Sequence, residues 1–468
     1  MSDILKLADI VKIKGGKRLP KGENLQITPN AHPYIRVRDM KGKFIPTDEL
    51  EYVPDHIFPK IKNYIVNTND VIVSIVGTIG LVSIITEKLN NASQTENCAK
   101  LSGLDRIDAE YLYYFLISEI GQAELQKATV GAVQPKLPLY GLENVSIDWK
   151  TRTEREEIVK QLNSLDNKIQ LNTQINQTLE QIAQALFKSW FVDFDPVRAK
   201  VQALSDGLSL EQAELAAMQA ISGKTAEELT TLSQAQPERY AELAETAKAF
   251  PCEMVEVDGV EVPKGWEVKP LPEIIDFLEG PGIRNWQYTE EEDGIKFINI
   301  RCIQNGDLTL TTANKITKEE AFGKYKHFQL EEDDIVVSTS GTLGRFAFVR
   351  KEHLPLSLNT SVIRFRPIKN KSTLGFIAGF VENQLQHELE IRASGSAQRN
   401  FGPTHLKQIS LLVPNFKLLE LHQKYASSLF EKRKQLLSEI DVLKDTRDLL
   451  LPKLLNGEFI KWKTQKEI

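Results

Sequence analysis

The sequence predicts an α+β fold: two duplicated α/β domains separated by a pair of long antiparallel coiled-coil helices, with pseudo-two-fold symmetry. The first observation is a repeat, because the stretch Asp70–Gly80 returns 264 positions later as Asp334–Gly344. The second is a change of period within each copy, from short alternating β-branched segments to a long run with 3.5-residue apolar spacing. A repeat this long indicates a duplicated domain rather than a solenoid of short units.

Other segments repeat at nearly the same offset. Tyr34-Ile-Arg-Val-Arg38 matches Phe297-Ile-Asn-Ile-Arg301, and Gly131-Ala-Val-Gln134 matches Gly395-Ser-Ala-Gln398. Two similar domains in one chain usually exist to contact two similar objects. The duplication therefore predicts a protein that binds at two related sites.

The first part of each copy, residues 1–150 and 263–414, has the composition of a mixed domain. Runs of Val, Ile and Phe bounded by Gly and Pro predict strands over 64–74, 81–86, 334–338 and 346–350. Helical spacing predicts helices over 109–126 and 374–391. Strands followed by helices within one copy favour an α+β domain.

The second part of each copy predicts a long helix, within 151–196 and within 415–468. The first seam comprises Ile158, Leu162, Leu165, Ile169, Asn172, Asn176, Leu179, Ala183, Leu186 and Trp190. The second comprises His422, Ala426, Leu429, Arg433, Leu436, Ile440, Leu443, Arg447, Leu450 and Leu454. Apolar spacing of 3.5 residues sustained over several heptads is typical of a coiled coil.

Two arrangements of these helices are open. Each helix alone could cap its own domain, but a helix of about 36 residues would be about 54 Å long, which is more than such a domain needs. Pairing the two helices buries both seams and makes a spacer, in which Asn172 and Asn176 would fix the register. Pro452 predicts fraying or a kink near the end of the second helix.

Net charge argues mildly against a nucleic-acid partner. The chain carries a formal charge of −6, but 197–262 alone hold 5 basic and 12 acidic residues. The rest keeps 53 basic and 52 acidic residues, so any DNA-binding face must arise by sorting charges to one side. The segment 197–262 itself predicts short acidic helices that link the two copies.

The remaining bulk features indicate a cytoplasmic protein. Three cysteines without a C-x-x-C pair argue against a disulfide framework or a thiolate zinc site. The N-terminus shows no signal-peptide pattern, and no uncharged apolar stretch reaches membrane-spanning length.

Motifs of catalysis are missing from the sequence. It contains no G-x-x-x-x-G-K-[ST] phosphate loop, no H-E-x-x-H metal motif and no [DN]-P-P-[YFW] motif of amino-methylating enzymes. The Gly77-Thr-Ile-Gly80 segment lies between two predicted strands, where glycine suits a tight turn. We therefore expect a chain that is not an enzyme by itself and that carries no cofactor or metal.

Polar loops at corresponding places in the two copies are candidate DNA contacts. Cationic side chains suit phosphate oxygens, and glutamine amides suit base edges. In the first copy the candidates are Lys17, Arg18, Lys21, Arg38, Gln134 and Lys136. In the second copy they are Arg284, Arg301, Gln398 and Arg399. The alternative for each residue is a loop that only turns the chain.

The sequence resembles the specificity subunit of type I restriction–modification systems. The resemblance covers nearly the whole chain, and it is carried by the duplicated domains with their long helices and by three short segments. These segments are Leu186-Phe-Lys-Ser-Trp-Phe-Val-Asp-Phe-Asp-Pro-Val197, Val262-Pro-Lys-Gly-Trp266 and Leu451-Pro-Lys-Leu-Leu-Asn-Gly-Glu458. The long acidic linker at 197–262 departs from the family pattern.

The resemblance implies a non-catalytic subunit that recognises a bipartite DNA target, with one target-recognition domain for each half. It also implies that two methyltransferase subunits dock on the helices and bring S-adenosylmethionine, and that two motor–nuclease subunits add ATP- and Mg-dependent cleavage. Because the loops differ between the copies, the two half-sites should differ. A protein–protein scaffold without DNA contact is the alternative that the neutral domains and acidic linker support. A methyltransferase fragment, which should bind S-adenosylmethionine alone, is a third.

Overall fold

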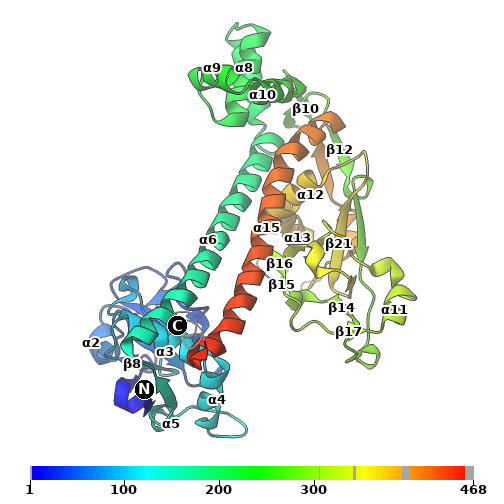
Figure 1. Ribbon diagram of the computed structural model, residues 1–468. Helices are drawn as coiled ribbons and strands as arrows, with labels where there is room; N and C mark the ends of the chain where they lie inside the picture. The colour runs from blue at the N-terminus through cyan, green and yellow to red at the C-terminus, as the bar shows by residue number, and fades with distance from the viewer. Residues whose placement is uncertain (1–2, 305, 341–343, 393–400, 459–468) are drawn as a thin grey trace, which may run out of the picture. The chain divides into compact units, whose positions relative to one another are not determined.

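The computed structural model describes residues 3–304, 306–340, 344–392 and 401–458. The chain divides into two compact units: unit 1 is Met1–Asn172 with Glu439–Ile468, and unit 2 is Thr173–Ser438. Two helices of 40 residues each, α6 (Arg152–Phe191) and α15 (Phe416–Leu455), contribute to both units (Figure 1). Each of these helices is about 60 Å long at ~1.5 Å per residue.

Unit 1 contains three small sheets. The largest is antiparallel, with the order β2 (Lys12–Gly15), β8 (Cys98–Ser102), β5 (Val71–Ser74) and β6 (Val82–Ile84). The second has the order β4 (Glu51–Tyr52), β3 (Pro33–Ile35) and β7 (Ser93–Gln94), and the third pairs β1 (Asp3–Lys6) with β9 (Ser146–Trp149). The helices are α1 (Leu7–Ile10), α2 (Phe58–Ile61), α3 (Arg106–Ile117), α4 (Glu119–Lys127) and α5 (Leu139–Glu143).

Unit 2 repeats these sheets in the same order. The four-stranded sheet is β13 (Ile275–Glu279), β21 (Val362–Pro367), β18 (Ile335–Ser338) and β19 (Phe346–Phe348). The smaller sheets are β17 (Lys315–Ile316), β14 (Ile295–Ile298) and β20 (Leu356–Leu358), then β12 (Glu267–Pro270) with β22 (Ser410–Val413). A short pair, β15 (Ile303–Gln304) and β16 (Asp307–Leu308), is added. The helices are α11 (Lys318–Phe322), α12 (Leu374–Phe380), a π-helical turn (Val381–Leu385), α13 (Gln386–Arg392) and α14 (Pro403–Leu406).

The repeated sequence that begins at Asp70 and at Asp334 forms one of the two inner strands of each four-stranded sheet, β5 and β18. All four residues of β5 and of β18 are buried, because each strand is covered on both faces. Val71 and Val73 face the core that contains α3, whereas Ile72 packs in a second cluster with Ile35 and Met40. A run of apolar residues without alternation is what a strand covered on both faces requires.

Polar and glycine residues of the same repeat hold the turns beside this strand. The carboxylate Oδ2 of Asp70 accepts a hydrogen bond from the backbone N–H of Asn67 at 2.8 Å, and Asp334 accepts one from Glu331 at 2.7 Å. Gly80 and Gly344 adopt φ values of +87° and +75°, which favour glycine. The predicted turn after β5 is therefore confirmed at Gly80.

The two long helices pair in antiparallel fashion within each unit. In unit 1 Asp166 of α6 pairs with Arg447 of α15 at 3.2 Å, and Lys168 pairs with Glu439 at 3.3 Å. In unit 2 Glu180 of α6 pairs with Arg433 at 3.4 Å, and the ring centroids of Trp190 and Tyr425 lie 5.7 Å apart. Residue numbers rise along one helix as they fall along the other, as the sequence predicted.

The seam residues of both helices are all buried or half-buried. Leu162 and Asn172 are 0 % exposed, and Leu436 is 3 % exposed. Within the described residues the amide groups of Asn172 and Asn176 have no hydrogen-bond partner. A buried amide without a partner costs stability, so the two asparagines favour a defined register over maximal stability.

The linker forms four helices and a hairpin within unit 2. The helices are α7 (Asp195–Ser205), α8 (Leu210–Ser222), α9 (Ala226–Ala235) and α10 (Pro237–Ala249), followed by β10 (Met254–Val257) and β11 (Val260–Pro263). Lys200 is 1 % exposed, and its Nζ donates to the carbonyl groups of Ala247 and Phe250 at 3.0 and 2.7 Å. This lysine joins α7 to the C-terminal end of α10.

Several sequence predictions of local structure were too long, including the strands over 81–86 and 346–350, which are Val82–Ile84 and Phe346–Phe348. The strand predicted over 64–74 begins only at Val71, because Asn69 has a φ of +70° and Asp70 closes a turn there. The helix predicted over 109–126 is two helices, since Ser118 has an extended backbone and its hydroxyl caps α4 through Gly121 N–H. Pro452 lies in the last turn of α15 and does not end the helix before Leu455.

Candidate nucleic-acid interface

The loops that carry Lys17 and Lys136 lie at one end of the four-stranded sheet of unit 1, whereas Arg38 lies in the turn after β3 of the second sheet. Gly15 of β2 pairs with Ala99, and Ser74 of β5 pairs with Cys98, so the ends of β2 and β5 lie together. The Lys17 loop follows β2 and is held by a hydrogen bond from Lys17 N–H to Gln94 O at 2.9 Å. This end of the sheet is the candidate interface of unit 1.

The loop with Gln134 and Lys136 lies at the same end. Val130 and Lys136 exchange two backbone hydrogen bonds of 2.9 Å, and Leu137 N–H donates to Ile75 O just beyond β5. The tip is exposed, with Val133 at 94 % exposure and Gln134 also exposed. The structure thus brings Lys17 and Lys136 to one end of one sheet.

The predicted cations differ in whether a carboxylate already pairs with them. Arg18 Nε lies 2.5 Å from Glu96 Oε1, and Arg38 Nη2 lies 2.6 Å from Glu51 Oε1. Within the described residues no carboxylate pairs with Lys17, Lys21, Lys136, Arg284 or Arg301. A phosphate would compete with an internal partner at Arg18 and Arg38, so the other five are better placed for phosphate contact.

Arg36 is a charged residue of this region that sequence reasoning missed. Its Nη1 lies 2.7 Å from Glu51 Oε2, and this hydrogen bond holds the pKa of Glu51 below its ordinary value. Arg36, Arg18, Glu51 and Glu96 line a cavity of about 440 Å³. The signal was present, because Arg36 stands inside the repeated strand motif two positions before Arg38.

The equivalent end of unit 2 carries fewer cations. Ser338 of β18 pairs with Val362, and Gly280 N–H donates to Val362 O at 3.1 Å, so the chain leaving β13 lies at this end. Arg284 is exposed in that segment, and Trp286 beside it is 80 % exposed. An exposed tryptophan suits stacking on a base or sugar, and the sequence analysis did not single it out. Gln398 and Arg399 lie outside the described residues.

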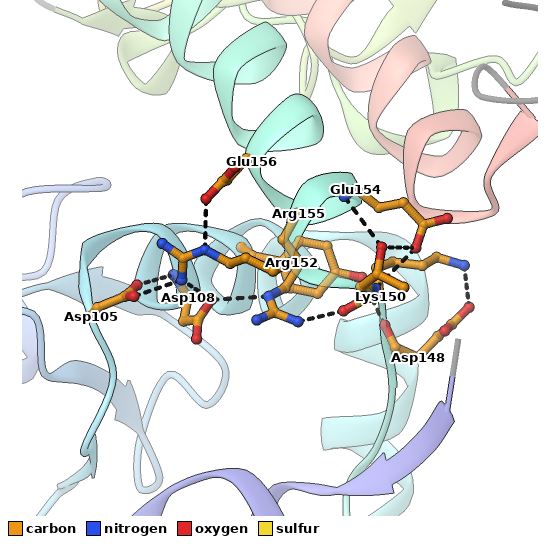
Figure 2. A network of polar contacts seen from close by, with 10 residues as sticks. Asp105, Asp108, Asp148, Lys150, Arg152, Glu154, Arg155 and Glu156 are labelled. Atoms are coloured by element: carbon orange, nitrogen blue, oxygen red, sulfur yellow. Dashed lines mark hydrogen bonds and ion pairs between the residues drawn. The ribbon is translucent and has the colours of Figure 1, made fainter. Parts of the chain in front are cut away.

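The first domain is fixed on α6 by a network of ion pairs (Figure 2). Arg152 Nη1 lies 2.6 Å from Asp105 Oδ2 and 2.9 Å from Asp108 Oδ1, and Arg155 Nε lies 2.9 Å from the same Asp108 oxygen. Arg155 also donates to the carbonyl oxygen of Lys150, and its guanidinium lies 4.4 Å from the Trp149 ring centroid.

One carboxylate of this network, Asp105, is also the N-cap of α3. Asp105 Oδ1 accepts from the backbone N–H of Asp108 at 3.0 Å, and this bond, followed by Arg152, holds the pKa of Asp105 below its ordinary value. The start of α3 and the first turn of α6 therefore share one set of charges. This joint fixes the direction in which the domain leaves the helix.

The joint of unit 2 has a different chemistry. Counted by the 264-residue offset, Phe416 and Leu419 stand where unit 1 has Arg152 and Arg155. Leu419 is 0 % exposed, and it packs in a cluster with Phe376 and Phe430. The two units thus share a fold but not the contacts that attach the domain to its helix.

The described residues contain neither a metal-binding cluster nor a membrane-spanning helix. Among the described residues, no group of three His, Cys, Asp or Glu side chains is arranged to hold a metal ion. Across the same part of the chain, no helix has both the length and the apolar character needed to cross a membrane.

Comparison with known proteins gives the family. A family described as type I restriction modification DNA specificity domain matches residues 2–181 and 263–435. The chain belongs to this family. Specificity subunits of type I systems are non-catalytic, so this chain is not an enzyme by itself. The family match leaves out 182–262, which includes the acidic linker.

Individual relatives agree with this family. The chain is 44 % identical over 332 residues to the HindI specificity subunit of Haemophilus influenzae, covering 69 % of this chain and 71 % of the relative. It is 23 % identical over 478 residues to the MjaIX specificity subunit of Methanocaldococcus jannaschii, covering 97 % and 93 %. The fold is similar to that of the S subunit from M. genitalium, with a TM-score of 0.50, 16 % identity and coverage of 97 % and 96 %.

Proposed function

We propose that this chain is the DNA-recognition subunit of a type I restriction–modification complex and that each recognition domain recognises one half of an asymmetric, bipartite target. The domains are residues 1–150 and 263–414, the helical spacer is 151–196 with 415–468, and 197–262 is a linker. One observation carries the proposal: two sheets of the same strand order present different polar loops at the same end. Two domains with the same strand order but different loops suit two half-sites that differ in base sequence.

Phosphate contacts are assigned to the candidate cations that no carboxylate pairs with among the described residues. In the first domain these are Lys17, Lys21 and Lys136, and in the second they are Arg284 and Arg301. Contacts of this kind supply affinity and orientation, whereas base contacts supply specificity. Gln134, Gln398 and the exposed Trp286 are assigned to contacts with bases or sugars.

The helices are the proposed docking sites of the enzymatic subunits. Leu171, Ile175 and Ile182 of α6 recur at helical spacing and are 49 %, 36 % and 48 % exposed, and Val442 and Leu449 of α15 are 64 % and 68 % exposed. Exposed apolar stripes of this kind mark protein interfaces. Two methyltransferase subunits with S-adenosylmethionine would flip and modify one adenine on each strand. Two motor–nuclease subunits would contribute ATP- and Mg-dependent cleavage, in the cytoplasm.

Methylation mapping of the host genome tests the function. Long-read sequencing with and without the gene should show the loss of one split adenine motif. Exchange of residues 263–414 for the equivalent domain of another specificity subunit should then change one half of the motif only. A methylation pattern unaffected by the gene would contradict the function, and a change in both halves would contradict the assignment of one half to each domain.

A further inference from the structure

The two units carry the same cavity. In unit 1 a cavity of about 250 Å³ lies where β9, α4 and the end of α15 meet, and in unit 2 one of about 390 Å³ lies where β22, the π-helical turn with α13, and the end of α6 meet. We propose that each cavity receives the same anchor, a basic and apolar segment of a methyltransferase subunit, so that each unit binds one copy. This inference rests on the proposed function and assigns a docking site to it.

Equivalence of the cavities follows from the 264-residue offset. The lining positions of unit 1 that recur as lining positions of unit 2 are Ile120, Glu124, Ser146, Ile147, Asp148 and Leu455. Their counterparts are Gln384, Glu388, Ser410, Leu411, Leu412 and Phe191. Both cavities are lined by strands and helices that the two units share, not by the loops that differ between them, so both units offer the same site. The repeated cavity therefore suits a partner that is present twice.

Both linings combine apolar residues with a glutamate; that of unit 1 also holds Asp148, and that of unit 2 also holds Asn383, Gln384 and His387. Glu124 and Glu388 stand at the same position, and among the residues that line the cavities there is no lysine or arginine. Among the described residues, each glutamate forms an ion pair with a cation of its own helix, Lys127 at 2.7 Å or Arg392, and Glu124 also accepts from the backbone N–H of Ser146 at 3.4 Å. Both glutamate side chains keep about a quarter of their surface exposed, so an incoming cation can reach them.

An exposed apolar residue stands beside each cavity on a strand with one paired edge. Ile4 of β1 is 79 % exposed, and its counterpart Val268 of β12 is 61 % exposed. Each strand forms a sheet of two, with β9 or with β22. The bound segment of the partner would therefore place an apolar side chain in the cavity and a cation beside the glutamate. Its backbone would run along the free edge of the strand.

A methyltransferase subunit fits this position better than a motor–nuclease subunit. Each cavity is built on a recognition domain, and methylation takes place on a base inside the sequence that this domain recognises. Cleavage after translocation takes place elsewhere on the DNA. A partner held by the recognition domain itself is therefore the one that acts on the half-site.

The test uses the full chain and its cognate methyltransferase subunit, with native mass spectrometry to count bound copies. Glu124→Lys and Glu388→Lys reverse the charge at each cavity, and Ser146→Trp and Ser410→Trp fill each cavity from a strand position that tolerates an aromatic residue. Gln126→Lys and Glu390→Lys are controls at equivalent, exposed positions two residues further along the same helices.

Each single variant should load one copy where the wild type loads two, with affinity at the altered site reduced at least tenfold, and the paired variants should load none. The controls should load two copies, and every variant should keep the DNA affinity of the free chain. A paired variant that still loads two copies overturns the docking site but leaves the proposed function intact. The docking site is also overturned if the variants lose a motor–nuclease subunit but still load both methyltransferase subunits. A wild-type chain that loads no methyltransferase would contradict the proposed function itself.

Discussion

Arg155 holds the first recognition domain on α6, and its removal should loosen that joint alone. The side chain is 9 % exposed, and it donates to Asp108 and to the carbonyl of Lys150 while it covers the Trp149 ring. A hydrogen bond to a charged partner contributes about 1.5–3 kcal/mol, and a cation–π contact about 0.5–2 kcal/mol. Because Asp108 keeps Arg152 as a partner, Arg155→Ala should destabilise the joint by about 3 kcal/mol rather than by the full sum.

Hydrogen exchange measured by mass spectrometry reports this loss locally. A change of about 3 kcal/mol corresponds to about a hundredfold faster exchange in peptides that cover 146–160. Peptides that cover 410–424 of unit 2 should be unchanged. Arg152→Ala is the matched control, since its side chain is 43 % exposed and solvent screens its ion pairs. Equal effects of the two substitutions, or an equal effect in unit 2, would refute this assignment of the joint.

Three further outcomes are expected. Replacing both Lys17 and Lys136 with glutamine should flatten the slope of log DNA affinity against log salt concentration by roughly 2. Arg18→Gln should change this slope less, because Glu96 already pairs with Arg18. Lys88→Gln, at the opposite end of the sheet, should not change it. Leu162→Asn or Leu436→Asn should cost about 3–5 kcal/mol in chemical denaturation and abolish methyltransferase assembly in gel filtration, whereas exposed Lys432→Asn should do neither. Burial raises the pKa of Glu382 to about 7, with Arg433 opposing the shift. The contribution of Glu382 to stability is therefore fully present below about pH 4.5 and should fall by about 3 kcal/mol as pH rises to about 7, so the difference in unfolding free energy between the wild type and Glu382→Gln should change by that amount; a difference that does not depend on pH would contradict the cause.

The strands, turns and paired helices shared by the two units could be predicted because each follows from a local sequence pattern. Valine and isoleucine runs fit strands covered on both faces, seam spacing fits paired helices, and Asp70 and Gly80 fit turns whose backbone needs them. Each of these features depends on a few neighbouring residues. They recur 264 positions later because the same geometry requires the same residue types.

The candidate site could be predicted only in part, because ion pairing depends on residues far apart in the chain. Arg18 and Lys17 are neighbours, yet only Arg18 has a carboxylate from residue 96 at 2.5 Å. No local pattern distinguishes the two. Arg36 and Trp286 were missed for the same reason, since their importance depends on Glu51 and on solvent exposure rather than on their neighbours in sequence.

The aromatic residues that pack between a recognition domain and its long helix stand on different elements in the two units. Tyr111 and Phe115 of unit 1 occupy the positions of Gly375 and Gly379 in unit 2, where a Cβ at Gly379 would lie 2.0 Å from a ring carbon of Phe187. In return, α6 brings Phe187 and Phe191 where α15 brings Leu451 and Leu455. The aromatic volume thus comes from the domain in one unit and from the long helix in the other.

This compensation constrains how recognition domains can be exchanged. A domain with an aromatic residue at the position of Gly379 cannot replace residues 263–414 unless the helix residue at 187 becomes smaller. A domain that lacks the acids at 105 and 108 would leave the buried Arg155 without its carboxylate, which costs about 3–5 kcal/mol for a buried pair. New specificity should therefore require that the joint residues travel with the domain, while the loops at the far end of the sheet are free to differ.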